Sequence, residues 1–328
     1  TDVNINYAFN DKDNSLTFTG TGASVSTYLH QSFVKMRELM GSAAKIYALD
    51  EEAFKNRITT IRSELMYLLN TNDGIGADFK AQEKRNLNYQ YLNNLNMYSR
   101  YHAHYANKPG FEPTSAFLSE LQAIDYNNDQ DFKESQEYRR LVKAYTSQKA
   151  VELAEKDTLP FEIAALKTYN KLESDFIKNA LLINDARFAI TYTDELEAYY
   201  TLFMEGSTNE DHRKEIQSIY EKLMAVNAGQ PSPIFENYEN HSGGTVSLND
   251  LKGNYVYIYV WATWNETSKY EFPFLKEFEK GYRDNNITFV GLSVDNKDDY
   301  DTWRTLVKQE ELGGIQLIAD KSFASQFI

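Results

Sequence analysis

The spacing of hydrophobic residues changes twice along the chain, and each change marks a different kind of structure. In the first segment apolar and polar residues alternate. The apolar positions there are Val3, Ile5, Tyr7, Phe9, Leu16 and Phe18, with a polar turn in the middle. Alternation with a period of two predicts strands. Residues 1–22 therefore predict a β-hairpin, compatible with the remnant of an N-terminal β domain.

From about residue 23 to residue 228 the spacing becomes helical. One apolar series consists of Leu29, Phe33, Met36 and Met40, and another of Phe54, Ile58, Ile61, Leu65 and Leu68. Steps of three and four place each series on one face of a helix. Glycine and proline interrupt the pattern at residues 73–74, 109–110, 113, 160 and 206. The segment predicts an irregular domain of about seven or eight helices, the last starting near Thr208.

The segment 229–233 (GQPSP) predicts a domain boundary, because its two prolines prevent helix continuation. Beyond it, β-forming runs at 255–261, 287–294 and 315–319 alternate with helical segments that extend through Lys280 and over 298–311. Strands that alternate with helices predict a parallel sheet with right-handed crossovers. The expected fold class is multidomain, α plus α/β, with an α/β domain over residues 231–328.

Composition indicates a folded, acidic protein. Hydrophobic residues make up 42% of the chain, and 48 acidic against 34 basic residues give a net charge of −14. A field of that sign argues against nucleic acid as a partner. The sequence has no apolar run of about 18 residues, the length that predicts a transmembrane helix. Its start carries no signal-peptide pattern, as in a mature or trimmed product.

The first strand of the α/β segment runs into the sequence WATWNETSKYEFP at residues 261–273. This resembles the TlpA/ResA branch of the thioredoxin-like proteins, related to the AhpC/TSA family. In that branch a strand ends in W-A-x-W-C-x-x-C and the helix continues K-x-E-x-P. Trp264 matches the aromatic position before the cysteines, and Glu271 and Pro273 match the positions after them. The resemblance covers about residues 231–328 and implies a thioredoxin-like domain of thiol-disulfide oxidoreductase ancestry.

Both redox cysteines of that pattern are replaced, and the sequence has no other cysteine. Asn265 stands at the position of the attacking cysteine and Ser268 at that of the resolving one. Thiol–disulfide exchange needs a thiolate, which neither an amide nor a hydroxyl supplies. These degenerate positions predict no catalytic residue and no cofactor. Asn265 is instead expected to cap the next helix by accepting from the N–H of residue 267 or 268, and Pro273 is expected to kink it.

A complete thioredoxin fold continues after its third such strand with a helix, a cis-proline loop, two more strands and a final helix. This sequence ends at Ile328, one turn into the next expected helix. The resemblance therefore implies an incomplete thioredoxin-like domain, truncated at its C-terminal end. Such a domain would leave one edge of its sheet exposed.

Two polar groups carry weak metal signals. One has the spacing of half a calcium loop and comprises Asp125, Asn127, Asp129 and Asp131. Gln130 replaces the glycine that such a loop requires, and Gln136 replaces its closing acid, which argues against calcium. His102 and His104 lie two residues apart and so on different faces of a helix, which argues against a shared metal ion. No metal site is expected.

The sequence favours a redox-inactive thioredoxin-like protein with a binding or scaffolding role. The partner expected for such a role is a protein or peptide. The alternative is a thiol-disulfide oxidoreductase family member with residual or partner-dependent redox activity. A third hypothesis, a carbohydrate- or peptide-binding module, predicts a concave aromatic cleft among the tyrosine-rich helices. Helical extensions ahead of such domains are familiar in Bacteroidetes envelope proteins. The resemblance therefore implies a periplasmic or outer-membrane-associated location, with room for a lipid anchor upstream of Thr1.

Overall fold

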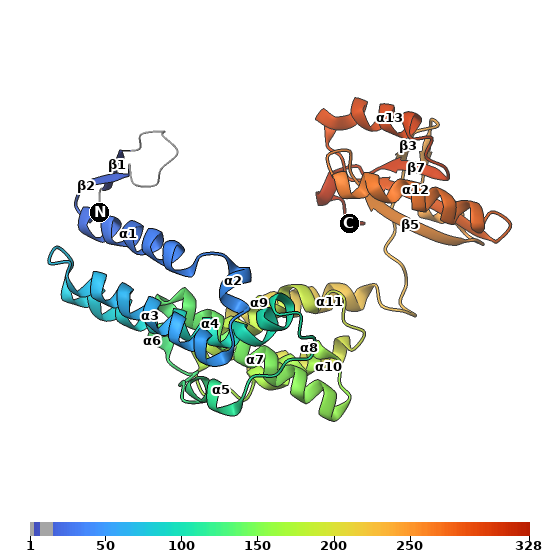
Figure 1. Ribbon diagram of the computed structural model, residues 1–328. Coiled ribbons are helices and arrows are strands. Elements are labelled where there is room, and N and C mark those ends of the chain that lie inside the picture. The colour runs from blue at the N-terminus through green and yellow to red at the C-terminus, as the bar shows by residue number, and fades with distance from the viewer. Residues whose placement is uncertain (1–2, 7–15) are drawn as a thin grey trace. The chain divides into compact units, whose positions relative to one another are not determined.

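The computed structural model describes residues 3–6 and 16–328 of the chain (Figure 1). These residues divide into two compact units, Thr1–Glu221 and Lys222–Ile328. The first unit begins with strands β1 (Val3–Asn6) and β2 (Thr17–Gly20), which pair antiparallel with Val3 opposite Gly20. Tyr7 and Phe9, expected on the same face as Val3, lie outside the described residues.

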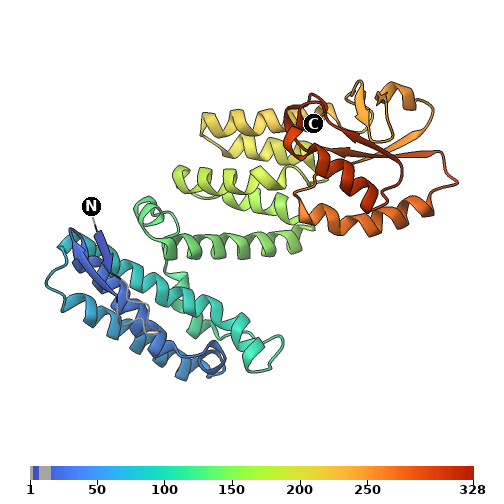
Figure 2. The ribbon, with the colours of Figure 1, turned by 90° about the horizontal axis from the view of Figure 1, so that it is seen from above.

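Helices make up the rest of the first unit. They are α1 (Ala23–Met40), α2 (Ala43–Tyr47), α3 (Glu51–Asn70), α4 (Ala77–Tyr105), α5 (Ser115–Gln122), α6 (Asp129–Glu134), α7 (Gln136–Asp157), α8 (Phe161–Tyr169), α9 (Asp175–Ala189), α10 (Leu196–Gly206) and α11 (Glu210–Ala225). Neighbouring long helices lie side by side, α1 on α3, α3 on α4, α4 on α7 and α7 on α8 (Figure 2). The structure thus has eleven helices between residues 23 and 225, and the expected seven or eight was wrong.

Five of the missed helix starts have a capping side chain, although Gly41 ends α1 and the start of α10 has no such cap. At each of the five, a polar side chain accepts from the backbone N–H three residues on, and these caps are Ser42, Asp50, Asn128, Ser135 and Ser174. Such a bond satisfies one of the free donors at a helix start, so a new helix can begin within a few residues of the last. The start of α11 is also corrected, because Asn209 rather than Thr208 accepts from the N–H groups of Asp211 and His212.

The core of the first unit forms where α1, α3 and α4 meet. Phe54, Ile58, Ile61 and Leu65 on α3 are buried there, as their spacing predicts. The face predicted for α1 is confirmed only in part, because Met36 and Met40 pack against this core whereas Leu29 and Phe33 do not. Leu29 and Phe33 are 46% and 53% exposed, while Tyr28 and Ser32 are buried. Tyr28 is preferred inside because its hydroxyl donates to Glu83 of α4 at 3.0 Å, so the buried phenol has a partner.

The second unit is built on a mixed sheet with the strand order β4-β3-β7-β6-β5. Its strands are β3 (Tyr238–Asn240), β4 (Thr245–Val246), β5 (Tyr255–Trp261), β6 (Ile287–Ser293) and β7 (Ile315–Ile318). β5 pairs parallel with β6, and β6 with β7, as the alternation of strands and helices predicts. β3 runs antiparallel to β7 and β4. Sequence analysis missed this pair, because strands of two or three residues carry no readable period.

Helices α12 (Glu266–Gly281) and α13 (Tyr300–Gln309) share one hydrophobic cluster with the sheet, in which Trp261, Phe272 and Trp303 are buried. A second cluster of the unit includes Phe235, Val290, Leu292 and Leu317. Within the described residues β5 is an edge strand. This arrangement brings the carboxyl ends of β5, β6 and β7 to one edge of the sheet, where the loops that follow them meet.

Candidate functional site

The degenerate motif lies where β5 runs into α12. Trp261 ends the strand and is buried against Phe272 of α12, with ring centroids 5.2 Å apart in an edge-to-face arrangement. Asn265 is the N-cap of α12, and its Oδ1 accepts from the N–H of Thr267 at 3.0 Å and of Ser268 at 3.4 Å. The amide therefore occupies two of the free N–H groups at the helix start.

The remaining matched positions lie around this cap. Ser268, in the first turn of α12, is half-buried. Trp264 is 54% exposed, and its ring centroid lies 6.0 Å from that of Phe323. Glu271 and Pro273 are exposed on α12 on either side of the buried Phe272, and Pro273 lies within the helix. Of the expected residues, the structure thus brings Asn265 and Ser268 into contact and leaves Glu271 facing solvent.

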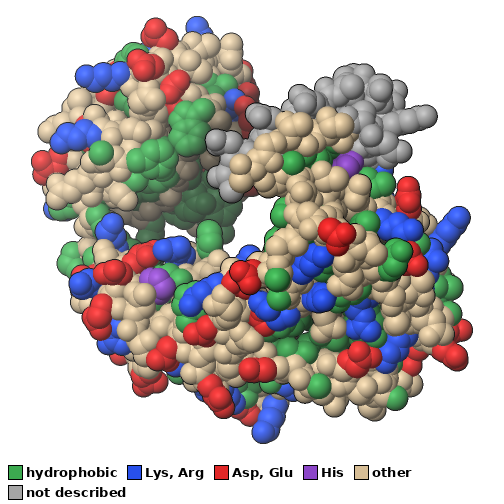
Figure 3. Space-filling view, turned by 90° about the vertical axis from the view of Figure 1, so that its left-hand side faces the viewer, with side chains coloured by type: hydrophobic (Ala, Val, Ile, Leu, Met, Phe, Trp, Pro, Cys, Tyr) green, Lys and Arg blue, Asp and Glu red, His purple; other side chains and the backbone are tan. Residues whose placement is uncertain are grey.

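Exposed aromatic side chains are frequent on the second unit. Those on or near α12 are Trp264, Tyr270, Phe274 and Phe323, each more than half exposed. Figure 3 shows hydrophobic side chains gathered on the visible face of this unit, at the upper left, whereas acidic and basic side chains are interspersed over the helical unit.

Sequence analysis missed one residue that shapes the site, Asp295. This carboxylate follows β6, is only 2% exposed, and accepts from the backbone N–H of Thr263 at 3.0 Å and its hydroxyl at 2.8 Å. The hydroxyl of Ser293 also donates to it at 2.7 Å. Asp295 therefore holds the turn between β5 and the Asn265 cap. The available signal was an acid directly after a buried strand, at the edge where parallel strands end.

The chemistry open to this site follows from its atoms. A helix start with free N–H groups stabilises a negative charge, which is how it would favour a thiolate. Here the atoms at the start of α12 are an amide and a hydroxyl, and the sequence has no cysteine. In the described part of the chain, no cluster of three or more His, Asp or Glu side chains is arranged to hold a metal ion. None of its helices is long and apolar enough to span a membrane.

The calcium-like segment has structural partners. Asp131 is 4% exposed and accepts from Arg85 Nε at 2.7 Å and from the hydroxyl of Tyr89 at 2.6 Å. Asn127 accepts from the backbone N–H groups of residues 173 and 174, and Asp129 accepts from the Ser174 hydroxyl. These bonds join the start of α6 to the start of α9.

The two histidines differ in their surroundings, as expected for positions on different faces of α4. His102 is buried at 1% exposure, with its Nδ1 2.9 Å from the carbonyl oxygen of Tyr47. His104 is exposed, and its ring packs edge-on against that of Tyr105.

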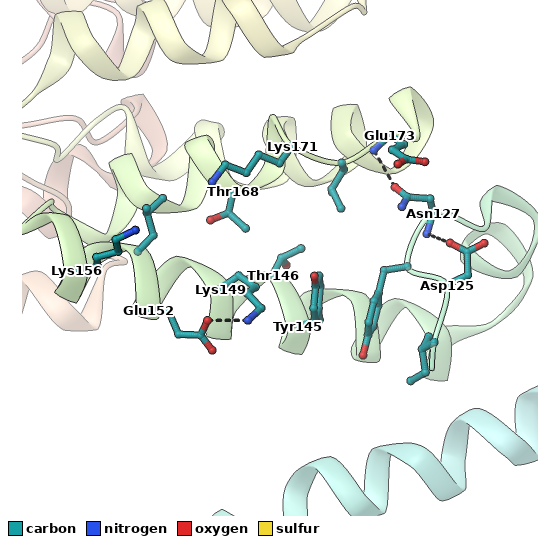
Figure 4. Close-up of a pocket in the computed structure, with 14 residues that line it drawn as sticks. Asp125, Asn127, Tyr145, Thr146, Lys149, Glu152, Lys156, Thr168, Lys171 and Glu173 are labelled. Atoms are coloured by element: carbon teal, nitrogen blue, oxygen red, sulfur yellow. Dashed lines mark hydrogen bonds and ion pairs between the residues drawn. The ribbon is translucent and has the colours of Figure 1, made fainter. Parts of the chain in front are cut away.

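A polar hollow of about 500 Å³ lies in the helical unit (Figure 4). Its walls are α7, the end of α8 and the segment between α5 and α6. Tyr145 of α7 stacks on Tyr126 with ring centroids 4.0 Å apart and planes 8° apart. The third sequence hypothesis predicts a concave aromatic cleft, whereas this hollow has one stacked tyrosine pair in a mostly polar lining.

Comparison with known proteins finds relatives of the second unit. Residues 228–325 match the family model of the AhpC/TSA family. The thiol-disulfide oxidoreductase ResA of Bacillus subtilis is 31% identical over 81 residues, which are 24% of this chain and 45% of that protein. A candidate thiol-disulfide oxidoreductase from Bacteroides vulgatus, solved in solution, is 45% identical over 29% of this chain and 61% of its own, with a TM-score of 0.25.

A second Bacteroides vulgatus structure, the thioredoxin domain of a thiol-disulfide oxidoreductase, is 25% identical over 29% of this chain and 66% of its own, with a TM-score of 0.27. This chain spans less than half the length of the curated ResA relative. The matches fall on the unit that carries the parallel strands and the Asn265 helix start. Family model, relative and motif thus agree that the C-terminal unit of this chain is similar to the TlpA/ResA-like thioredoxin-like proteins of the AhpC/TSA family.

Proposed function

We propose that this chain is a redox-inactive thioredoxin-like protein that serves binding or scaffolding rather than electron transfer. The observation that carries the proposal is the helix start at Asn265. Its amide oxygen accepts hydrogen bonds from the two N–H groups that would stabilise an attacking thiolate. Ser268 stands where the second cysteine would be. Neither side chain can form a mixed disulfide, because that bond requires sulfur on both partners.

The residues around the degenerate motif favour a surface that binds a partner. Asp295 still holds the turn before the helix with a buried carboxylate, which is costly to keep unless its partners are in place. Trp264 and Phe323 remain exposed beside the cap. An anchored turn with exposed aromatic side chains beside it, and no cysteine, is the arrangement expected of a surface that binds a protein or peptide.

An insulin-reduction assay tests the redox part of the proposal. With dithiothreitol as reductant, the chain should give no turnover above the reductant alone, whereas a thioredoxin gives rapid precipitation of the insulin B chain. A double variant, Asn265→Cys with Ser268→Cys, restores the C-x-x-C spacing and should oxidise to an intramolecular disulfide. The pair Glu277→Cys with Lys280→Cys, at the same spacing near the other end of α12, is the matched control. Turnover by the unaltered chain, alone or with a thiol partner added, would favour the alternative of residual redox activity.

We place the protein in the cell envelope, periplasmic or associated with the outer membrane, on the strength of its family resemblance. Fractionation of cells that express the natural gene checks this, with a cytosolic enzyme and a periplasmic enzyme as markers. Recovery of the protein with the cytosolic marker would contradict it.

A further inference from the structure

A second hollow of the helical unit lies between α4, α5 and α7. Its volume of about 830 Å³ is within the range of ligand sites, about 300–1,000 Å³. Asn96 and Ser99 line it from one turn of α4, and Leu141 and Tyr145 line it from one turn of α7. Residues three and four positions apart lie on the same face of a helix. Each helix therefore presents one short stretch of a single face to the hollow.

The deepest part of this hollow is aliphatic. Leu118 and Leu121 of α5, Ile124 of the following segment and Leu141 of α7 line it. Leu141 is buried, and the other three side chains are half-buried. A large aliphatic side chain of a ligand that enters this part is removed from water. Such burial improves affinity about tenfold to hundredfold.

One asparagine of α4 differs from the others on that helix. α4 carries several asparagines between positions 86 and 96, although asparagine is a poor helix former. Within the described residues, Asn96 has no hydrogen-bond partner, and it is half-buried in the lining of the hollow. Its carboxamide is therefore free to donate to a ligand and to accept from it. The others hold bonds to other segments, and they are Asn86 with Ser135, Asn88 with Arg62, Asn93 with Glu137 and Asn94 with Tyr47.

The charges that line the hollow leave one carboxylate unpaired. Lys149 is neutralised by Glu152, with 2.7 Å between Nζ and Oε2. Glu112 is exposed at the rim and forms no ion pair with any described residue. A positive charge on the ligand is therefore favoured near Glu112. An exposed ion pair of this kind adds about twofold to fivefold in affinity.

We propose that this hollow binds an extended peptide segment in which a leucine-like side chain has a basic residue nearby. The aliphatic side chain fills the space that Leu118, Leu121 and Leu141 line. A peptide group of the ligand bonds to the carboxamide of Asn96, and the basic residue lies near Glu112. The site belongs to the helical unit, so it is independent of the redox chemistry of the thioredoxin-like unit.

A peptide fits these side chains better than a neutral sugar does. A peptide group carries one donor and one acceptor, which match the acceptor and donor of a carboxamide. The aliphatic part of the lining provides no partner for a sugar hydroxyl, and burying a hydroxyl without a partner is unfavourable. Tyr126 and Tyr145 stack on each other with ring centroids 4.0 Å apart, so each ring has one face already covered.

Isothermal titration of the full chain with three synthetic heptapeptides tests the proposal. They have the sequences KSGLSGK, KSGSSGK and ESGLSGE, and both ends are blocked so that only side chains are charged. Lysines stand on both sides of the leucine, so either chain direction places one near Glu112. We expect KSGLSGK to bind and KSGSSGK to bind at least tenfold more weakly, because it lacks the leucine. ESGLSGE should bind more weakly than KSGLSGK because its charges are reversed.

Variants locate the binding. Asn96→Ala should weaken KSGLSGK about fivefold, the size of one hydrogen bond. The melting temperature should not fall, because alanine is the better helix former. Met97→Ala is the matched control, since Met97 is the next residue of α4, is exposed and lies outside the hollow. Glu112→Gln should weaken KSGLSGK about twofold to fivefold and should not weaken ESGLSGE.

Four results would overturn the proposal. The first is no binding of KSGLSGK up to about 10 mM, a limit above the range of specific sites. The second is equal binding of KSGSSGK, which would indicate only attraction of lysine to an acidic protein. The third is an effect of Met97→Ala as large as that of Asn96→Ala, and the fourth is tighter binding of D-glucose than of KSGLSGK. None of these results changes the outcome of the insulin assay, so the two proposals fail separately.

Discussion

The pKa of a single cysteine placed at position 265 would measure how strongly the start of α12 stabilises a thiolate. Because the sequence has no native cysteine, the variant Asn265→Cys carries one thiol and gives an unambiguous signal. Asn265 Oδ1 now accepts from the N–H groups of Thr267 and Ser268 at 3.0 and 3.4 Å. A thiolate in its place would accept from the same donors at the positive end of α12.

The expected size of the effect follows from this geometry. A free thiol has a pKa of about 8.5, and helix starts lower it into the range of about 3.5–7.5. The carboxylate of Glu266 opposes the shift, but it is 76% exposed and paired with Lys269 at 2.8 Å, so we expect a pKa near the upper end of that range. A decrease of about 1.5 units corresponds to about 2 kcal/mol of stabilisation of the thiolate.

The rate of alkylation by iodoacetamide, followed by mass spectrometry between about pH 5 and pH 10, gives this pKa because the thiolate is the reactive form. The matched control is Lys280→Cys, a single thiol in the last turn of the same helix. There the dipole has the opposite sign, and the pKa should lie at or above about 8.5. Equal pKa values for the two variants would refute the claim that residue 265 occupies the functional position of the family motif.

Three further substitutions test side-chain contacts within each of the two units. Burial raises the pKa of Asp185, so the folded state carries a penalty once this carboxyl ionises. Asp185→Asn should therefore raise the melting temperature at pH 7, with the gain fading as the pH falls toward the ordinary carboxyl range. Asp295→Ala should lower the stability of the C-terminal unit by about 3 kcal/mol, because the buried donors of Thr263 lose their acceptor. Gly206→Ala should cost about 2 kcal/mol or more, because its Cβ would lie 1.8 Å from Asn170 Oδ1.

The measurements can separate the two units. All three tryptophans lie in the C-terminal unit, so their fluorescence during urea unfolding reports on Asp295→Ala alone. An unchanged midpoint there would contradict the anchoring role of Asp295. Gly281→Ala is the control for Gly206→Ala, because nothing lies within 4 Å of its added Cβ. Equal stability of those two variants, or a lower melting temperature of Asp185→Asn at pH 7, would contradict the packing argument.

Prediction from sequence worked where one strong local signal decided the outcome. The β-forming runs at 255–261 and 287–294 gave parallel strands. β6 is buried over most of its length, as a covered strand should be, whereas β5 lies at the edge of the described sheet and exposes Tyr255 and Val260. The Asn265 cap was predictable because the amide acts on N–H groups only two and three residues away. Leu29 and Phe33 of α1 were predicted wrongly, because an exposed apolar pair cannot be told from a buried one by residue type.

By itself, the sequence determined the absence of cysteine, the acidic charge, the sheet-forming runs and the helix start at Asn265, because each depends on residue identity or on neighbours a few positions away. Only the tertiary structure decided the rest. It set Asp295 under the turn at Thr263 and gathered Asn96, Leu118 and Leu141 around one hollow. It also chose Tyr28 over Leu29 for the core. These outcomes depend on contacts between residues distant in sequence, and local spacing carries no information about which distant partner satisfies a buried group.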